Sequence, residues 1–207
     1  MNKRVYLVRH GQTVGNVAAT TQGPDDPLNE IGLEQARLCA KRVQAFDFEC
    51  IVSSDFTRAI DTAEAIRTET DKEVHQSELF RELRRPSEFW GKKITEHPEI
   101  LEAYQQINDN YLNQDWHYSD EENFYDLKTR GLAALEYLLA REEEKILVVT
   151  HGNFLRALIG VVLRGGSYDG QDYLDIEATF EAGNTSVSVI EYTHHWRQDK
   201  FTWALRS

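Results

Sequence analysis

Basic residues are scarce in this chain of 207 residues, which has 23 Lys and Arg against 35 Asp and Glu and a formal net charge of −12. A protein that tracks nucleic-acid phosphates needs a basic surface, so this balance argues against a nucleic-acid partner. Cysteine is also rare, since Cys39 and Cys50 are the only two. The sequence therefore implies no disulfide framework, and a reducing, cytoplasmic location is expected.

Long apolar runs are missing as well. No run approaches the roughly 20 residues that cross a bilayer, so no membrane association is expected. The apolar segment at the start of the chain ends at Arg9, which is too short for the core of a signal peptide. With 41% hydrophobic and 28% charged residues, the composition is that of a globular protein rather than a disordered one. The length fits one domain that carries an insertion.

Short apolar runs alternate with helical patterns over most of the chain. The runs at 5–8, 51–54 and 146–149 predict buried strands, because they are short, rich in β-branched residues and sharply bounded. Helical spacing predicts helices at 30–46 (including Leu33), 55–66 (capped by Ser54), 127–139 and 154–163, and a final hairpin joins strands at 185–192 and 201–205 around His194 and His195. This alternation predicts a three-layer α/β/α sandwich with a mainly parallel sheet and helices on both faces.

The stretch from about 83 to 126 differs from the rest of the chain. It shows no convincing strand pattern, and one helix is expected after Pro98. Nine acidic residues and no Lys or Arg lie between 94 and 126, whereas the segment 81–93 has five basic residues against two acidic ones. We interpret 83–126 as a helical insertion in a single domain of residues 1–207. The basic segment either binds a second anionic group of a substrate or is a solvated loop.

Polar residues follow three of the predicted strands. Arg9 and His10 come directly after the first, Arg58 lies in the first turn of the helix after the second, and His151 follows the run at 146–149. The carboxyl ends of parallel strands meet at one edge of a sheet, where helix N-termini favour anions. Arginine forks match phosphate oxygens, and a histidine among them can act as nucleophile or donor. Because the other histidines show no metal-ligand spacing, the pattern predicts metal-free phosphoryl chemistry.

Four motifs in order carry a resemblance to a known family. They are Leu7-Val8-Arg9-His10-Gly11-Gln12-Thr13 with Asn16, Pro27-Leu28-Asn29-Glu30-Ile31-Gly32 with Gln35-Ala36, Ser53-Ser54-Asp55-Phe56-Thr57-Arg58-Ala59 with Thr62-Ala63, and Val148-Val149-Thr150-His151-Gly152. With these motifs the chain resembles the histidine phosphatase superfamily, which includes the cofactor-dependent phosphoglycerate mutases. Asn184 also fits, whereas the stretch from about Pro86 to Asp126 does not.

The resemblance implies a two-step mechanism at one anion site. His10 would attack phosphorus and become phosphohistidine, while Arg9, Arg58, His151 and Asn16 would bind the phosphoryl oxygens. A carboxylic acid would protonate the leaving oxygen and then activate water. The match for this acid is Glu82, with Glu88 as the alternative because the residues around it depart from the family pattern. Asn16 has a second interpretation, as a residue that only starts a helix. No cofactor or metal is implied.

The function expected from the resemblance is that of a metal-independent phosphomonoester phosphatase that releases phosphate from a small phosphorylated metabolite. A phosphoglycerate mutase is the alternative, because both activities use the same residues. A catalytically weak phospholigand-binding protein is a second alternative, which depends on Glu82. The insertion at 83–126 is expected to form a lid whose aromatic and acidic residues favour an apolar or cationic leaving group. Its other interpretation is a helix pair with an acidic solvent face.

Overall fold

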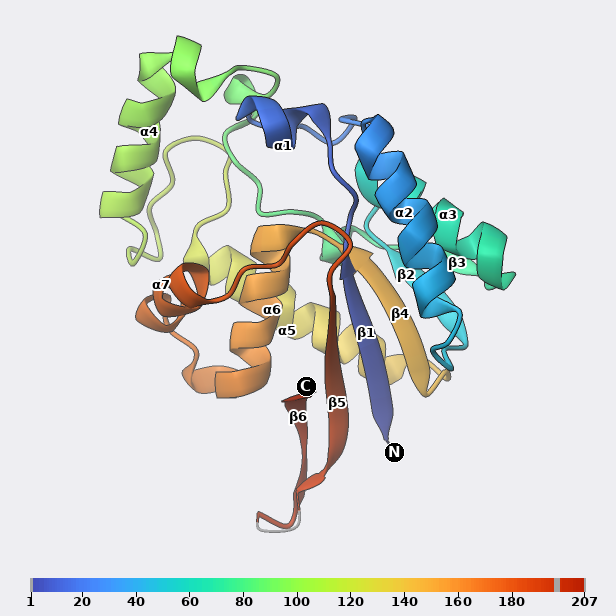
Figure 1. Ribbon diagram of the computed structural model, residues 1–207. Helices are drawn as coiled ribbons and strands as arrows, with labels where there is room; N and C mark the ends of the chain where they lie inside the picture. The colour runs from blue at the N-terminus through green and yellow to red at the C-terminus, as the bar shows by residue number, and fades with distance from the viewer. Residues whose placement is uncertain (1, 196–197, 207) are drawn as a thin grey trace.

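A six-stranded sheet forms the middle layer of the part of the chain that the computed structural model describes, residues 2–195 and 198–206 (Figure 1). The strands are β1 (Lys3–Arg9), β2 (Cys50–Ser53), β3 (Val74–Gln76), β4 (Lys145–Thr150), β5 (Val187–His195) and β6 (Lys200–Arg206), in the spatial order β3-β2-β4-β1-β5-β6. The first four are parallel, whereas β5 runs antiparallel to both β1 and β6. The predicted mainly parallel sheet is confirmed.

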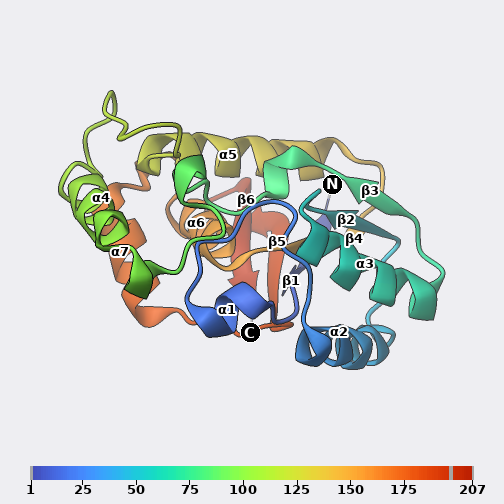
Figure 2. The ribbon, with the colours of Figure 1, turned by 90° about the horizontal axis from the view of Figure 1, so that it is seen from above.

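Helices cover both faces of the sheet, which confirms the three-layer prediction (Figure 2). One face packs against α2 (Glu30–Val43) and α3 (Thr57–Thr70), and the other against α5 (Phe124–Ala140) and α6 (Gly152–Arg164). Successive strand residues face opposite cores, as the period of a strand requires. For example, Ile51 packs with α2 and α3, whereas Val52 packs with α5 and α6. The two free thiols, Cys39 and Cys50, lie in different cores.

The start of α2 follows from local chemistry. Asn29 is the N-cap, and its Oδ1 accepts a hydrogen bond of 2.8 Å from the Gly32 N–H. Ala36, Ala40 and Val43 are buried on one face, but Leu33 is 54% exposed. The predicted apolar face is therefore wrong at Leu33, because Gly32 is the residue that makes the close contact, with the loop after β1.

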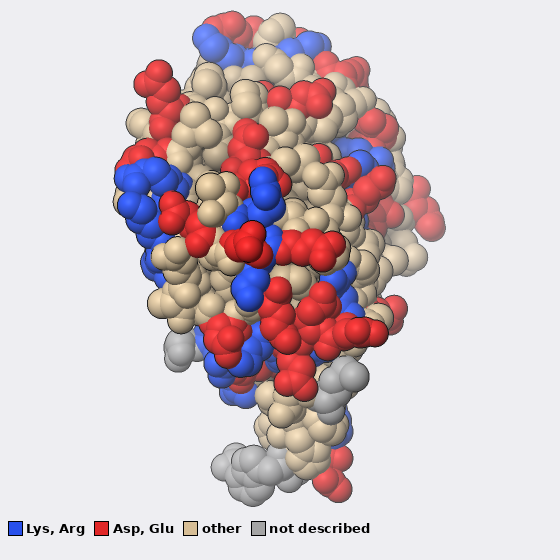
Figure 3. Space-filling view, turned by 90° about the vertical axis from the view of Figure 1, so that its right-hand side faces the viewer, with Lys and Arg blue, Asp and Glu red and all other residues tan. Residues whose placement is uncertain are grey.

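Charged side chains are interspersed on the face of the molecule formed by α2 and α3 (Figure 3). Each helix carries an ion pair between residues three apart, Glu34 with Arg37 and Glu64 with Arg67. Such pairs lie on a solvated helix surface. Within the described ranges, no helix is both long and apolar enough to span a membrane.

Several short elements differ from the sequence prediction. Periodicity does not predict α1 (Val14–Ala18), α7 (Gly170–Thr179) or the edge strand β3. The N-cap of α3 is Phe56 rather than Ser54, and no side chain caps this helix. The hairpin of β5 and β6 is confirmed, but His194 and His195 belong to β5 itself; the prediction that they form its turn is wrong. The chain between these strands includes 196–197, which lie outside the described residues.

The insertion lies at the carboxyl ends of the parallel strands, beside α1 (Figure 1). It contains 3-10 turns at Ser87–Phe89 and Ile94–Glu96 and the expected helix, α4 (Pro98–Asp109). Backbone hydrogen bonds of Thr21 with Gly91 and Lys92 tie it to the loop after α1. The Tyr104 and Thr21 hydroxyl groups add a contact of 3.0 Å. The insertion is thus joined to the loop that follows α1 rather than held only at its ends.

Candidate active site

A close backbone crossing fixes the loop that follows β1. A Cβ atom built on Gly32 would lie 1.9 Å from the Gln12 carbonyl oxygen, and one on Gly11 would lie 2.5 Å from the Gly32 carbonyl oxygen. Only glycine fits at such an approach. The Gly11 N–H also donates to the Thr62 hydroxyl at 3.1 Å. The loop is therefore held by the starts of two helices, α2 and α3.

His10 is held within this loop as a neutral imidazole. It is 2% exposed, and its Nδ1 lies 2.6 Å from the Gly11 carbonyl oxygen. A carbonyl oxygen only accepts, so Nδ1 carries the proton and the lone pair lies on Nε2. Burial and then the Arg58 charge lower the pKa of His10 well below its usual value, although the bond to Gly11 opposes this. The result is an uncharged imidazole at neutral pH, with a lone pair available on Nε2.

Arg9 and Arg58 supply buried positive charge next to His10. Arg58 is 2% exposed and donates to the Gly23 carbonyl oxygen at 2.7 Å, while Arg9 donates to the Ala182 carbonyl oxygen. The Nε atoms of both arginines are buried without a partner among the described residues. Burial lowers the pKa of both guanidinium groups, and the Glu82 charge raises it. Unpaired buried donors of this kind fit an anion that binds between them.

His151 provides a further donor. It is fully buried, and its ring centroid lies 5.0 Å from that of His10. Its Nε2 lies 2.8 Å from the Ser54 hydroxyl, which itself accepts the Phe56 N–H at 3.2 Å. Because the Phe56 N–H occupies one lone pair of the Ser54 hydroxyl, we infer that this hydroxyl donates to Nε2 and that the His151 proton lies on Nδ1, which has no partner among the described residues. Burial, followed by the Arg58 charge, lowers the pKa of His151 well below its usual value.

Glu82, not Glu88, is the acid that the fold brings to this site. Its Oε1 accepts from the N–H groups of Leu83 at 2.8 Å and Phe154 at 3.0 Å, and its Oε2 from that of Asn153 at 3.3 Å. The last two donors belong to the first turn of α6, which favours a carboxylate. Oε2 makes the longer bond and is the oxygen freer to exchange a proton. Glu88 is exposed in the turn Ser87–Phe89, outside this group of contacts.

Asn16 has a structural role at the start of α1. Its Oδ1 accepts from the Thr13 N–H at 3.1 Å while its own N–H donates to the Thr13 hydroxyl, which completes a capping box. Asn184, which donates to the His10 carbonyl oxygen at 3.0 Å, lies 3.5 Å from the same Oδ1. The side-chain NH₂ group of Asn16 is the part left for a ligand. The interpretation of Asn16 as a helix-start residue therefore fits its side-chain oxygen, whereas its side-chain nitrogen is available to a ligand.

A cavity of about 510 Å³ extends from Glu82 and Phe56 towards the insertion. The Phe56 ring connects this cavity with the residues around His10, since its centroid lies 5.4 Å from that of His151 and 5.1 Å from the Arg58 guanidinium. The cavity is lined by Gln22, Pro24, Phe56, Glu78, Leu79, Arg81, Glu82, Leu83, Arg84, Arg85, Trp90, Asp120, Glu122 and Arg130. Its size suits a small metabolite.

Sequence reasoning missed two residues of the site, Ser54 and Phe56. It treated Ser54 as a helix cap and Phe56 as part of an apolar helix face. Their position directly after β2 was the available signal, since Arg9 and His151 were identified by the same position after their strands. Arg130 was also missed, because its contact with the cavity depends on how α5 packs.

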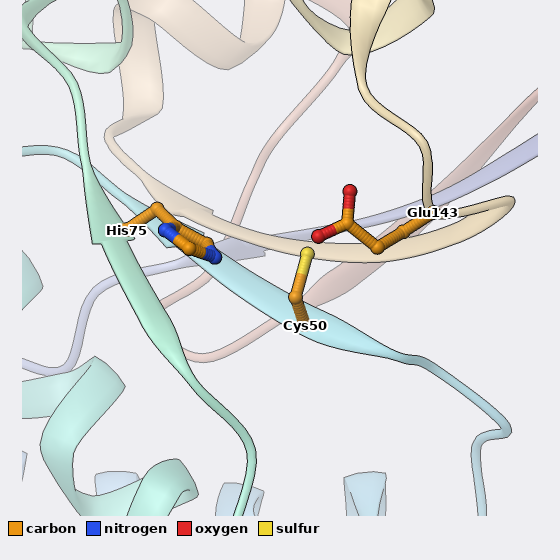
Figure 4. Close-up of side chains that lie close together, drawn as sticks. All are labelled: Cys50, His75 and Glu143. Atoms are coloured by element: carbon orange, nitrogen blue, oxygen red, sulfur yellow. The ribbon is translucent and has the colours of Figure 1, made fainter.

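A second group of titratable residues, Cys50, His75 and Glu143, lies at the other end of β2 (Figure 4). Their possible ligand atoms lie within 4.8 Å of one another, a proximity that their spacing in the sequence does not reveal. However, Arg141 binds both oxygens of Glu143, at 2.7 and 3.0 Å. Burial and the nearby Glu143 charge raise the pKa of the Cys50 thiol to about 12. A protonated thiol and an occupied carboxylate are poor metal ligands, so these residues fit a structural contact better than a metal centre.

Comparisons with known proteins agree with this geometry. Residues 5–202 match the family model of the histidine phosphatase superfamily, branch 1. A metal-independent phosphoserine phosphatase of Arabidopsis thaliana is 32% identical, over 95% of this chain and 78% of that protein. A probable phosphoglycerate mutase, GpmB, of Proteus mirabilis is 30% identical, over 91% and 85% respectively. The native structure of a mycobacterial glucosyl-3-phosphoglycerate phosphatase has a TM-score of 0.77 at 26% identity, over 99% of this chain and 97% of that one. The chain therefore belongs to branch 1 of the histidine phosphatase superfamily and is a phosphatase or mutase of that family.

Proposed function

We propose that the protein is a metal-independent phosphomonoester phosphatase that acts through a phosphohistidine intermediate on a small phosphorylated metabolite. One observation carries this proposal above the others: a neutral, buried His10, oriented by the Gly11 carbonyl, lies among unpartnered donors of Arg9, Arg58 and His151. A neutral imidazole is a nucleophile, and fixed cationic donors stabilise the charge of a phosphoryl group in transfer.

The first step would transfer the phosphoryl group to His10. Nε2 forms a bond to phosphorus as the ester P–O bond breaks, and the Glu82 carboxyl gives its proton to the departing oxygen. In the second step Glu82 accepts a proton from water, whose oxygen attacks phosphorus as the N–P bond breaks. Inorganic phosphate leaves, and His10 and protonated Glu82 are restored. The insertion would act as a lid that covers the cavity in which the leaving group lies.

Two similarities favour hydrolysis, and one favours isomerisation. The Arabidopsis relative is named a phosphoserine phosphatase and the mycobacterial structure a phosphatase of glucosyl-3-phosphoglycerate, whereas GpmB is named a probable mutase. A mutase is therefore the second candidate. The position of Glu82, whose charge raises the pKa of Arg9 and Arg58, favours turnover over the alternative of a catalytically weak phospholigand-binding protein.

The test is turnover of a panel of phosphomonoesters, including 3-phosphoglycerate, by purified protein with and without a chelator. We expect phosphate release that the chelator leaves unchanged and that His10→Ala abolishes. With a substrate whose leaving group needs no proton, an acid-labile phosphoryl group should accumulate on the Glu82→Gln variant, which lacks the base of the second step, and be absent from His10→Ala. Conversion of 3-phosphoglycerate to its 2-isomer without net phosphate release would establish the mutase instead. Activity that requires a metal, or that persists in His10→Ala, would overturn the mechanism.

A further inference from the structure

Four arginines line the cavity beside Glu82, and two of them are already neutralised. Arg81 forms a two-point ion pair with Asp55 and also binds Glu78 at 3.0 Å. Arg130 binds both oxygens of Glu122 at 2.7 Å and donates to the carbonyl oxygens of Leu79, Arg81 and Glu82. These two arginines build the wall of the cavity and have little capacity left for a ligand.

Arg84 and Arg85 are in a different position. Within residues 2–195 and 198–206, neither guanidinium forms an ion pair or a hydrogen bond, although both line the cavity. The Arg85 guanidinium lies 5.2 Å from the centre of the Tyr104 ring, on α4 of the insertion. The Arg84 main chain is held by Glu122, which accepts from its N–H and donates to its carbonyl oxygen, both at 3.0 Å. Both guanidinium groups are thus without an ion pair or hydrogen bond among the described residues, while the Arg84 backbone is anchored.

The acids of the cavity compensate these two charges only in part. Glu122 and Glu78 are paired with Arg130 and Arg81. Asp120 accepts the Ser87 N–H at 2.9 Å; this bond first, and the Arg84 charge to a lesser degree, lowers its pKa, so that Asp120 offsets part of the Arg84 charge. The expectation of an apolar or cationic leaving group is therefore not supported, because the two insertion acids that line the cavity, Asp120 and Glu122, are both bonded to protein groups.

We propose that Arg84 and Arg85 form a second anion-binding site that recognises a carboxylate on the leaving group. The substrates would then be small phosphomonoesters of hydroxy acids, with the phosphoryl group at His10 and the carboxylate at the two arginines. Guanidinium forks bind carboxylates at two points, and the adjoining cavity has room for a leaving group of a few carbon atoms. This proposal rests on the proposed phosphatase function and adds the class of substrate.

The experiment compares substrates with and without a carboxylate. O-phosphoserine is paired with O-phosphoethanolamine, in which hydrogen replaces the carboxylate, and 3-phosphoglycerate with glycerol 3-phosphate, in which a hydroxymethyl group replaces it. We expect the native protein to have kcat/KM at least tenfold higher for the acid of each pair. Arg84→Ala/Arg85→Ala should remove this preference by raising KM for the acids, with little change for the partners that lack a carboxylate. Arg84→Lys/Arg85→Lys, which keeps the charges without the planar forks, should lie between the native protein and the double alanine variant. Lys93→Ala is the control, because Lys93 pairs with Glu96 outside the cavity lining.

The outcomes separate the two proposals. If the native protein releases phosphate equally from both members of each pair, and the double alanine variant does the same, the carboxylate site is wrong while the phosphatase function stands. If no phosphate is released from any substrate, the proposed function itself is wrong. An equal loss on all four substrates would mean that Arg84 and Arg85 only support the fold of the cavity, which also overturns the proposal.

Discussion

The proton positions of His10 and His151 are set by single neighbours. Gly11 takes the Nδ1 proton of His10, while Ser54 meets Nε2 of His151. The centroids of the two rings lie 5.0 Å apart. The nitrogen without a partner is Nε2 in His10, which carries a lone pair, and Nδ1 in His151, which carries an N–H. A nucleophile beside a donor needs this difference, because two lone pairs would repel a phosphoryl oxygen.

Ser54→Ala should lower activity by removing the partner of His151 Nε2. We expect kcat/KM to fall about tenfold, because the ring loses the bond that keeps its proton on Nδ1 and a buried acceptor is left unpaired. Steady-state kinetics on an active phosphomonoester measure the effect. Ser53→Ala is the matched control: Ser53 is equally buried, but its hydroxyl donates to the Ser54 carbonyl oxygen. Equal losses in the two variants would show that Ser54 acts only through stability.

At the level of single residues, the strand pattern of the sequence predicts that Arg9, His10 and His151 lie at one edge of the sheet. Arg9 ends β1, His10 and His151 directly follow strands, and the two histidine rings lie 5.0 Å apart. The lack of ion pairs at Arg84 and Arg85 was not predictable from the sequence. It depends on the tertiary contacts in which Asp55 pairs with Arg81 and Glu122 pairs with Arg130. Likewise, only the structure reveals that the Asn16 side-chain oxygen caps α1 while its nitrogen remains available to a ligand.

Among the elements, the crossing of the His10 loop over the start of α2 is the most tightly constrained contact. Gly32→Ala would drive a methyl group against the Gln12 carbonyl oxygen, a backbone atom that cannot swing aside. We expect a loss of about 2 kcal/mol or more in the free energy of unfolding, together with reduced activity as His10 shifts.

Urea unfolding measures this loss. Gly166→Ala serves as the control, since a Cβ there meets no atom within 4 Å, and it should change stability by less than about 0.5 kcal/mol. A Gly32→Ala variant as stable as the native protein would show that the crossing can relax.

Long elements were predictable, and short ones were not. α2, α3, α5 and α6 repeat their apolar pattern over three or more turns, whereas β3 has three residues and α1 has five, too few for a period. Leu33 shows the limit of the pattern even in a long helix: it has the right spacing but is exposed, because the close contact belongs to Gly32.

For the molecule as a whole, burial of two neutral histidines makes stability depend on pH. Well above pH 6.5 neither state protonates His10 or His151 appreciably. As the pH falls below 6.5, the unfolded chain takes up these protons, while the folded protein, whose pKa values are lowered, does not. The free energy of unfolding should therefore decrease, by at most about 1.4 kcal/mol per pH unit for each histidine, until the pH reaches the folded pKa.

Urea unfolding between pH 7.5 and 5 gives this slope. His10→Gln and His151→Gln should each reduce it, whatever their effect on stability at neutral pH. An unchanged slope in both variants would mean that other groups cause the pH dependence.

The central place of β1 in the sheet also has a consequence for how the chain folds. Val5, near the start of the sequence, pairs with Ile146 on one side and Ile190 on the other. During synthesis β1 therefore cannot pair with both of its neighbours until β5 has left the ribosome. Contacts so distant in sequence slow folding, because a long loop must close before they form. A nascent chain that ends before Asn184 leaves one edge of β1 unpaired and also lacks the hydrogen bond from Asn184 to the His10 carbonyl oxygen. Such a chain already contains His10, but the strand pairing and the hydrogen bond that hold the His10 backbone form only later.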